Sequence, residues 1–123
     1  MGLSALYWKE EVEDIAKIIR KNSDNLILIG PIGWSYDLFK IASNPIKDYN
    51  IAYSVHPYSI HKNWKENFEL IMSKFPIVVT GWGFKNDTEE VFMKAGEEDY
   101  GKPILKFMGE NNISWVAWYY DNV

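Results

Sequence analysis

The sequence contains no cysteine, only two histidines and no excess of basic residues. Without cysteine, the chain can have neither disulfide bonds nor a thiolate metal site. Thirteen Lys and Arg residues against 17 Asp and Glu residues give a formal net charge of −4. This balance, with no basic run to offset phosphate charge, argues against a nucleic-acid or anionic-membrane partner. No stretch approaches the roughly 20 apolar residues of a membrane span.

Two sequence signals are also missing. The "GPIGW" stretch (30–34) has neither the G-x-G-x-x-G spacing nor the Lys of a phosphate-binding loop, so nucleotide binding is a weak alternative and no cofactor is expected. The N-terminal residues do not show the basic-then-apolar pattern of a secretory leader. The compartment therefore stays unassigned.

Aromatic residues, by contrast, are abundant. Six Trp, eight Tyr and six Phe make up 16% of the chain, more than a core of this size needs. Rings that cannot all be buried often serve as ligand platforms, and sugars are one such ligand.

Helical and strand patterns alternate along the 123 residues, a length typical of one domain. Apolar spacing predicts helices over 4–22, 64–75 and 97–111, and a single helical turn at 36–42 within the loop 31–45. Short apolar runs predict strands at 25–30, 50–58, 76–81 and 113–121. Strands joined by helical crossovers are parallel, so the sequence predicts an α/β fold that begins with a helix.

Polar and aromatic residues collect where the predicted strands end. These residues are Trp34, His56, Tyr58, Trp82, Trp118 and Tyr119. In a (β/α) barrel the carboxyl ends of the strands form the active face. The spacing of two between His56 and Tyr58 places both side chains on the same side of a strand.

The same segments resemble a known family. "LILIGPIGWSYDL", "IAYSVHPY", "IVVTGWG" and "NNISWVAWYYD" look like the fifth to eighth strands of glycoside hydrolase family 5, the cellulase family of retaining (β/α)8 barrels. The resemblance implies a single half-barrel domain over 1–123, the C-terminal half of a TIM-type barrel, with an endo-β-1,4-glucanase-like ancestry. Members of this family are often secreted.

The resemblance also assigns roles to residues. His56 and Tyr58 match the family's His-x-Tyr at the sixth strand, and Trp118 matches the Trp that supports the sugar ring at its eighth. Trp34 matches a Trp that often precedes Ser in the family's fifth-strand loop. Trp34, Trp82 and Trp118 are therefore the candidate substrate-binding residues. The family's seventh strand ends in Thr-Glu-Trp-Gly, with the Glu as nucleophile. Here Gly81 stands in its place, before Trp82. The family's acid/base Glu, at the end of the fourth strand, would precede residue 1.

Retaining glycosidases need two carboxylates about 5 Å apart, and no nearby residue is a convincing substitute for the nucleophile. Asp87, Glu89 and Glu90 read as a solvated loop cluster, and Asp37 reads as a helix cap. A metal pair of His56 and His61 would lack a third ligand, so no metal is expected.

Several alternatives stay open at this point. Trp34 and Trp118 could be sugar platforms or core residues, whereas Trp8, Trp64 and Trp115 are expected in the core. The chain could be a silenced enzyme fragment, inactive in isolation, that binds a β-glucan-type oligosaccharide weakly at most. It could instead be a non-catalytic carbohydrate-binding or self-assembling half-barrel module.

Assembly is expected because helical crossovers cover only one face of a parallel sheet. Strand alternation predicts that the other face presents Ala52, Ser54, Ile77 and Val79 toward the barrel interior. The expected partner is either a second copy in a homo-oligomer or a missing N-terminal half-barrel that supplies the other strands.

Overall fold

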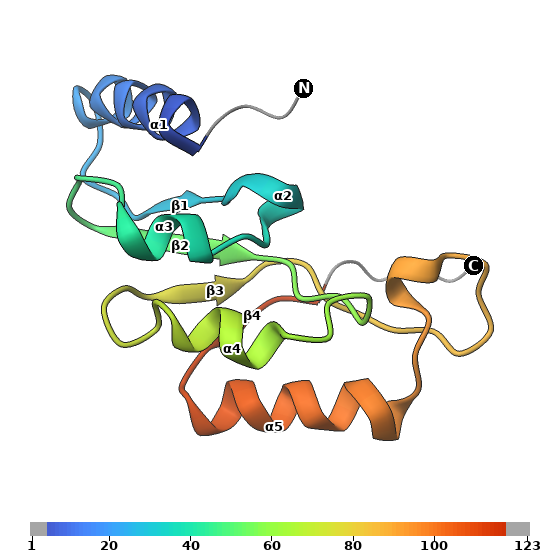
Figure 1. Cartoon of the computed structure of the whole chain (residues 1–123). Helices are drawn as coiled ribbons and strands as arrows, with labels where there is room; N and C mark the ends of the chain where they lie inside the picture. Colours follow the sequence, from blue (N-terminus) through green and yellow to red (C-terminus); the bar gives the residue numbers. More distant parts are fainter. Residues whose placement is uncertain (1–4, 118–123) are drawn as a thin grey trace.

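Two short aliphatic runs, a longer mixed run and a Ser-Trp pair form the four strands of the sheet. The computed structural model describes residues 5–117. Its strands are β1 (Ile27–Ile29), β2 (Ile51–Val55), β3 (Ile77–Val79) and β4 (Ser114–Trp115), and they pair in parallel in the order β1-β2-β3-β4. Each strand follows a helical segment, as Figure 1 shows. The predicted α/β architecture of four parallel strands with helical crossovers, helix first, is confirmed.

The longest helix, α1 (Ala5–Arg20), precedes β1. A short turn labelled α2 (Ile32–Ser35) and the helix α3 (Phe39–Ser43) lie between β1 and β2. Helix α4 (Trp64–Glu69) leads to β3. A 3-10 turn (Val91–Met93), a π-type turn (Glu97–Gly101) and the helix α5 (Lys102–Glu110) lead to β4. Within residues 5–117, none of these helices has both the length and the apolarity that a membrane span requires.

Strand register separates a covered face from an open one. Tyr53 pairs with Ile77, and Val55 pairs with Val79. These four side chains are at most 6% exposed and belong to one core cluster with residues of the helices, including Phe68 of α4. The core therefore lies between the sheet and its helical layer.

The open face carries the alternate row of residues. Leu28 pairs with Ala52, and Ser54 pairs with Val78, which pairs with Ser114. The prediction that Ala52 and Ser54 share this face is confirmed.

The prediction that Ile77 and Val79 also share this face is wrong, and Val78 takes that position. The prediction assumed strict alternation from Gly81 back through Val79 and Ile77. In the structure β3 ends at Val79, and Thr80 lies on the same side as Ser54, to which it is hydrogen-bonded.

Several predicted elements are shorter in the structure. The helix expected over 64–75 ends at Glu69, because the chain must turn before it enters β3 and the residue before Pro76 avoids helical geometry. The last strand comprises Ser114–Trp115, and 118–121 of its predicted range lie outside the described residues. Trp64 is buried as predicted, but Trp115 is 46% exposed and is not a core residue.

Candidate functional site

A left-handed turn presents Trp34 at the carboxyl end of β1. Gly33, Trp34 and Ser35 have φ values of 69°, 58° and 59°. This geometry is natural for Gly but costs other residues roughly 1–2 kcal/mol each. The Ser35 carbonyl accepts a 2.8 Å hydrogen bond from the backbone N–H of His56, which ties the turn to the end of β2. The Trp34 side chain is 94% exposed, so the core-residue alternative for Trp34 is wrong.

A row of hydroxyl groups fixes His56 at the end of β2. The Nε2 atom of His56 lies 2.9 Å from Oγ1 of Thr80, which in turn shares a hydrogen bond with Oγ of Ser54. Burial lowers the pKa of His56. The ring is therefore neutral at pH 7, with one nitrogen engaged by Thr80.

Gly81 lies directly against this imidazole. A Cβ atom at position 81 would stand 3.0 Å from Cδ2 and 3.2 Å from Nε2 of His56. Any side chain at 81 thus requires the His56 ring to shift by a few tenths of an ångström. The missing side chain and the position of His56 are therefore coupled.

Tyr58 stands beside His56 and is backed by the long loop after β3. The Tyr58 and His56 rings are edge to face with centroids 6.4 Å apart, and Phe92 packs edge to face on Tyr58 at 4.9 Å. Burial raises the pKa of the Tyr58 hydroxyl, so this group stays a hydrogen-bond donor at neutral pH. The segment around Phe92 is held by backbone bonds such as Ile60 N–H to the Phe92 carbonyl.

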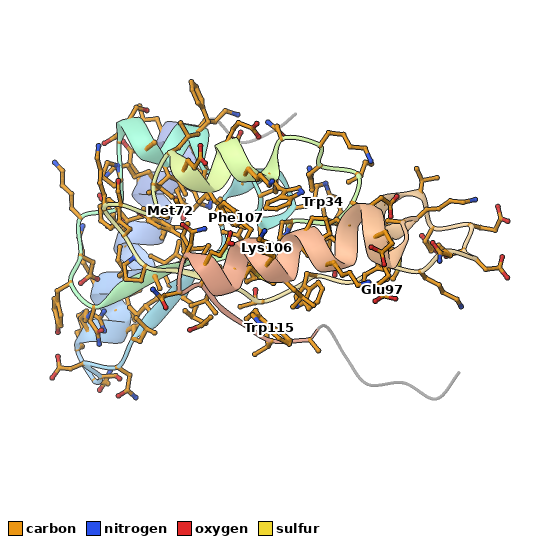
Figure 2. The ribbon with its side chains drawn as sticks, turned by 90° about the horizontal axis from the view of Figure 1, so that it is seen from below. Trp34, Met72, Glu97, Lys106, Phe107 and Trp115 are labelled. Carbon is orange, nitrogen blue, oxygen red and sulfur yellow. The ribbon has the colours of Figure 1, made fainter. Side chains whose placement is uncertain are left out.

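Trp82 points away from the solvent, unlike Trp34. Its side chain is 9% exposed and packs edge to face on Trp115 at 5.2 Å. Figure 2 labels Trp34 and Trp115, which lie on opposite sides of α5 in that view. The buried Nε1 of Trp82 has no hydrogen-bond acceptor among residues 5–117. Trp118, the other predicted platform, lies outside the described residues, as does Tyr119.

The carboxylates near the site do not replace a nucleophile. Asp87, Glu89 and Glu90 are exposed in the loop after β3. Asp37 caps no helix, contrary to the expectation, because α3 begins after Leu38; Asp37 pairs with Lys40 at 3.2 Å instead. No group of three or more metal-binding side chains occurs in the described part of the chain.

The structure thus brings Gly81, His56 and Tyr58 together at the ends of β2 and β3. Sequence reasoning missed Ser54 and Thr80, which orient His56. Their positions were visible in the sequence, since Ser54 is two residues before His56 and Thr80 directly follows β3. That the two hydroxyl groups meet depends on the register between β2 and β3, which the sequence does not give. It also missed Phe92, whose contact with Tyr58 joins two distant loops.

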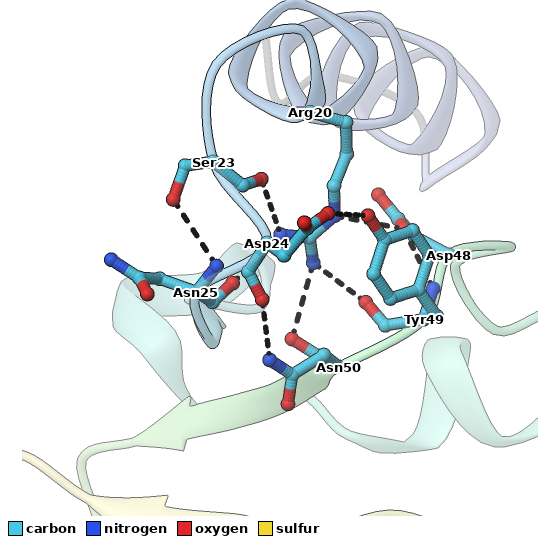
Figure 3. A network of polar contacts seen from close by, with 7 residues as sticks. All are labelled: Arg20, Ser23, Asp24, Asn25, Asp48, Tyr49 and Asn50. Atoms are coloured by element: carbon cyan, nitrogen blue, oxygen red, sulfur yellow. Dashed lines mark hydrogen bonds and ion pairs between the residues drawn. The ribbon is translucent and has the colours of Figure 1, made fainter.

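At the opposite edge of the sheet, where β1 and β2 begin, the contacts are centred on Arg20, the last residue of α1. Its Nε donates to Asp48 at 3.2 Å, and its terminal nitrogens donate to four backbone carbonyls at 2.6–3.3 Å. The guanidinium also stacks 4.4 Å over the Tyr49 ring, whose hydroxyl donates to Asp24. Figure 3 shows how these contacts tie the end of α1 to the segments that enter β1 and β2.

Comparisons with known proteins point to one family. The family model for cellulases (glycosyl hydrolase family 5) matches residues 4–123. Endoglucanase A of Evansella cellulosilytica is 29% identical over 116 residues, which are 89% of this chain and 23% of that protein. A cellulase of Thermoanaerobacterium is 31% identical over 121 residues, which are 89% of this chain and 31% of that protein.

Solved structures give the same result. A β-glucanase from Saccharophagus degradans, crystallised with cellotetraose, superposes with a TM-score of 0.82 at 27% identity and covers 93% of this chain and 38% of its own. An endoglucanase catalytic domain from Thermobifida fusca gives 0.76 at 27% identity, with 99% and 42% covered.

The parallel sheet with helical crossovers and its similarity to these family 5 structures give the chain the fold of half a (β/α) barrel. The family match over nearly its whole length is more specific: the chain belongs to glycosyl hydrolase family 5, the cellulases. It spans about a quarter to a third of the length of the two curated relatives named above.

Proposed function

We propose that this chain is the C-terminal half of a β-glucan-binding family 5 barrel that holds an oligosaccharide but does not cleave it. Gly81 against the His56 ring carries the proposal. Trp34 would supply an aromatic face for a sugar, and His56 and Tyr58 would supply polar contacts at the neighbouring strand ends. Affinity for a cello-oligosaccharide is expected to be no better than roughly millimolar, because a half-open site covers only one side of the ligand.

Loss of hydrolysis follows from chemistry at position 81. A retaining mechanism needs a carboxylate to attack the anomeric carbon and a second carboxyl group to protonate the leaving oxygen. Gly81 provides no carboxylate, and the described strand ends β1 to β4 contribute no acid in its place. Removing a nucleophile of this kind typically costs several orders of magnitude in rate.

The test is incubation of the purified 123-residue chain with carboxymethyl cellulose and an aryl cellobioside. We expect no release of reducing ends or of the aryl group. Gly81→Glu is expected to stay inactive, because the second carboxyl group would still be missing and His56 would have to move. Turnover that co-purifies with the chain through successive columns would overturn the proposal, and restoration by Gly81→Glu would show that the catalytic pair has been misplaced.

We further propose that four more strands cover the open face of the sheet in an eight-stranded barrel. Within the described residues, β1 and β4 each pair on one side only. Exposed apolar side chains occur on the edge strand β1 and on α1, which precedes it. Leu26 and Leu28 are 50% and 47% exposed, and Ile15 and Ile18 of α1 are 55% and 61% exposed. Unpaired strand edges and exposed apolar patches of this kind are typical of surfaces that pack against another chain or segment.

An isolated chain can find such strands only in another copy of itself, so we expect it to form a dimer or a larger oligomer. Light scattering at micromolar concentration measures this directly. A stable monomer near 14.4 kDa with cooperative unfolding would contradict the assembly proposal, while leaving the sugar-binding proposal to its own test.

A further inference from the structure

A second concave surface lies between the α2–α3 segment and α4. It is a groove of about 540 Å³, a volume within the usual range of ligand sites. Its lining residues are Gly33, Tyr36, Asp37, Phe39 on one side and Asn63, Glu66, Asn67, Leu70 on the other. The second group is spaced i, i+3, i+4 and i+7, so one face of α4 and the residues that flank its two ends form that wall.

The wall opposite α4 is held in place by contacts on several sides of Tyr36. The Tyr36 ring stacks on His61 with centroids 3.5 Å apart and an interplanar angle of 9°. Its hydroxyl donates to Oδ1 of Asn63 at 3.0 Å. Burial, helped by the charge of Glu66, raises the pKa of Tyr36 to about 12, so the hydroxyl remains a donor at neutral pH.

Asn67 fixes the backbone of the same wall. This residue is 5% exposed, and its Nδ2 donates to the Tyr36 carbonyl at 2.6 Å while its Oδ1 accepts from the Leu38 N–H at 3.2 Å. A buried amide that bridges two elements costs free energy if either partner is lost. The groove is therefore preformed and does not depend on a ligand for its shape.

The free groups in the groove suit a neutral, polyhydroxylated ligand. Phe39 is 69% exposed and offers a ring face. Glu66 is exposed and forms no ion pair within residues 5–117, and the Asn63 amide nitrogen donates no hydrogen bond there. A carboxylate and an amide beside a ring can hydrogen-bond hydroxyls while the ring stacks on the C–H face of a sugar. No lysine or arginine lines the groove, which disfavours an anionic ligand.

We infer that this groove is an accessory binding site for a β-linked gluco-oligosaccharide, reached past Trp34 from the strand-end site. The choice of a gluco-oligosaccharide rests on the proposed function. Gly33, the residue before Trp34, lines the groove and so connects the groove to the strand-end site. One chain segment thus contributes both to the strand-end site and to the groove.

Titration of the 123-residue chain with cellotetraose, followed by amide NMR, tests the inference. We expect shifts in 36–39 and 63–70 that saturate separately from those at 54–58 and 80–83. Phe39→Ala should weaken binding at the groove by about threefold to tenfold, and Glu66→Gln should weaken it severalfold. The matched controls are Leu105→Ala on α5 and Glu69→Gln, an exposed neighbour on α4 that does not line the groove.

Each outcome separates the two sites. Groove shifts that persist in Trp34→Ala, or that occur without strand-end shifts, would support the groove even if the proposed function failed. Shifts confined to the strand ends, or an equal effect of Glu66→Gln and Glu69→Gln, would overturn the inference. Thermal unfolding of each variant shows whether the exposed substitutions leave the fold intact.

Discussion

The two edges of the sheet differ in how they use their polar groups. At the edge where β1 and β2 begin, Arg20 uses all its nitrogens on Asp48 and on backbone carbonyls. At the edge where the strands end, Trp34 is 94% exposed, and within residues 5–117 only one ring nitrogen of His56 forms a hydrogen bond. In barrel folds the first edge serves stability and the second serves function. The contacts in this half-barrel fit the same division, with satisfied polar groups where β1 and β2 begin and exposed ones where they end.

The largest effect on stability is expected from the first edge. Arg20→Ala removes the links between α1 and the entries to β1 and β2 and leaves Asp48 with a largely buried carboxylate. We expect a loss of about 3 kcal/mol in the free energy of unfolding. Lys17→Ala is the control, since its pair with Asp14 is 72% exposed on both sides and should change stability by less than about 0.5 kcal/mol.

Chemical denaturation at a fixed protein concentration measures both variants, because self-association would make stability concentration-dependent. Equal effects of Arg20→Ala and Lys17→Ala would remove the distinction between the two edges.

At the second edge we expect a substitution that improves stability while harming binding. Trp34→Gly relieves the left-handed strain at φ 58°, whereas Trp34→Ala retains it. The Gly variant should therefore be more stable than the Ala variant by about 1 kcal/mol. Both should lose affinity for cellotetraose. If the Ala variant is as stable as the Gly variant, the turn stores no strain.

A smaller effect concerns pH. Burial lowers the pKa of both histidines, His56 and His61, below the ordinary value of 6.5. Between the lowered pKa values and about 6.5 the unfolded chain binds more protons than the folded chain. The free energy of unfolding therefore keeps its full value above about pH 6.5 and declines as the pH falls from there through the lowered pKa values. The lowered pKa of Glu13, which accepts hydrogen bonds from Lys9 and from the Lys47 N–H, acts only below its ordinary value of 4.5.

Unfolding midpoints between pH 7.5 and 5 measure this dependence. The variant with both His56→Gln and His61→Gln should lose most of the decline above pH 5. A decline of unchanged size in that variant would place its origin elsewhere. NMR titration of the chain's two imidazoles gives the pKa values directly.

Local patterns in the sequence predicted much of this fold, and pairing between distant segments accounts for the errors. Short apolar runs and helical spacing locate β1 to β4 and α1 because these signals are carried by neighbouring residues. The face of β3 was misassigned because Val78 is placed by its register with Ser54, which alternation counted from Gly81 cannot supply.

The candidate sites show the same limit. That the His56 and Tyr58 rings lie side by side was predictable because their spacing of two is local. The groove was not found, since Asn63 and Glu66 look like the solvated side of a helix until the α2–α3 segment is placed opposite them. The left-handed turn at Trp34 and Ser35 was also missed, because non-glycine residues give no sequence signal for that geometry.

The most direct test of the account is a long incubation of the isotope-labelled chain with cellotetraose in the NMR tube, observing protein and sugar together. We predict amide shifts at 30–35, 54–58 and 80–83 while the tetrasaccharide stays intact. Cleavage of cellotetraose by the pure chain, or the absence of any shift at these strand ends up to the solubility of the sugar, would contradict the central claim that this edge binds a β-glucan without hydrolysing it.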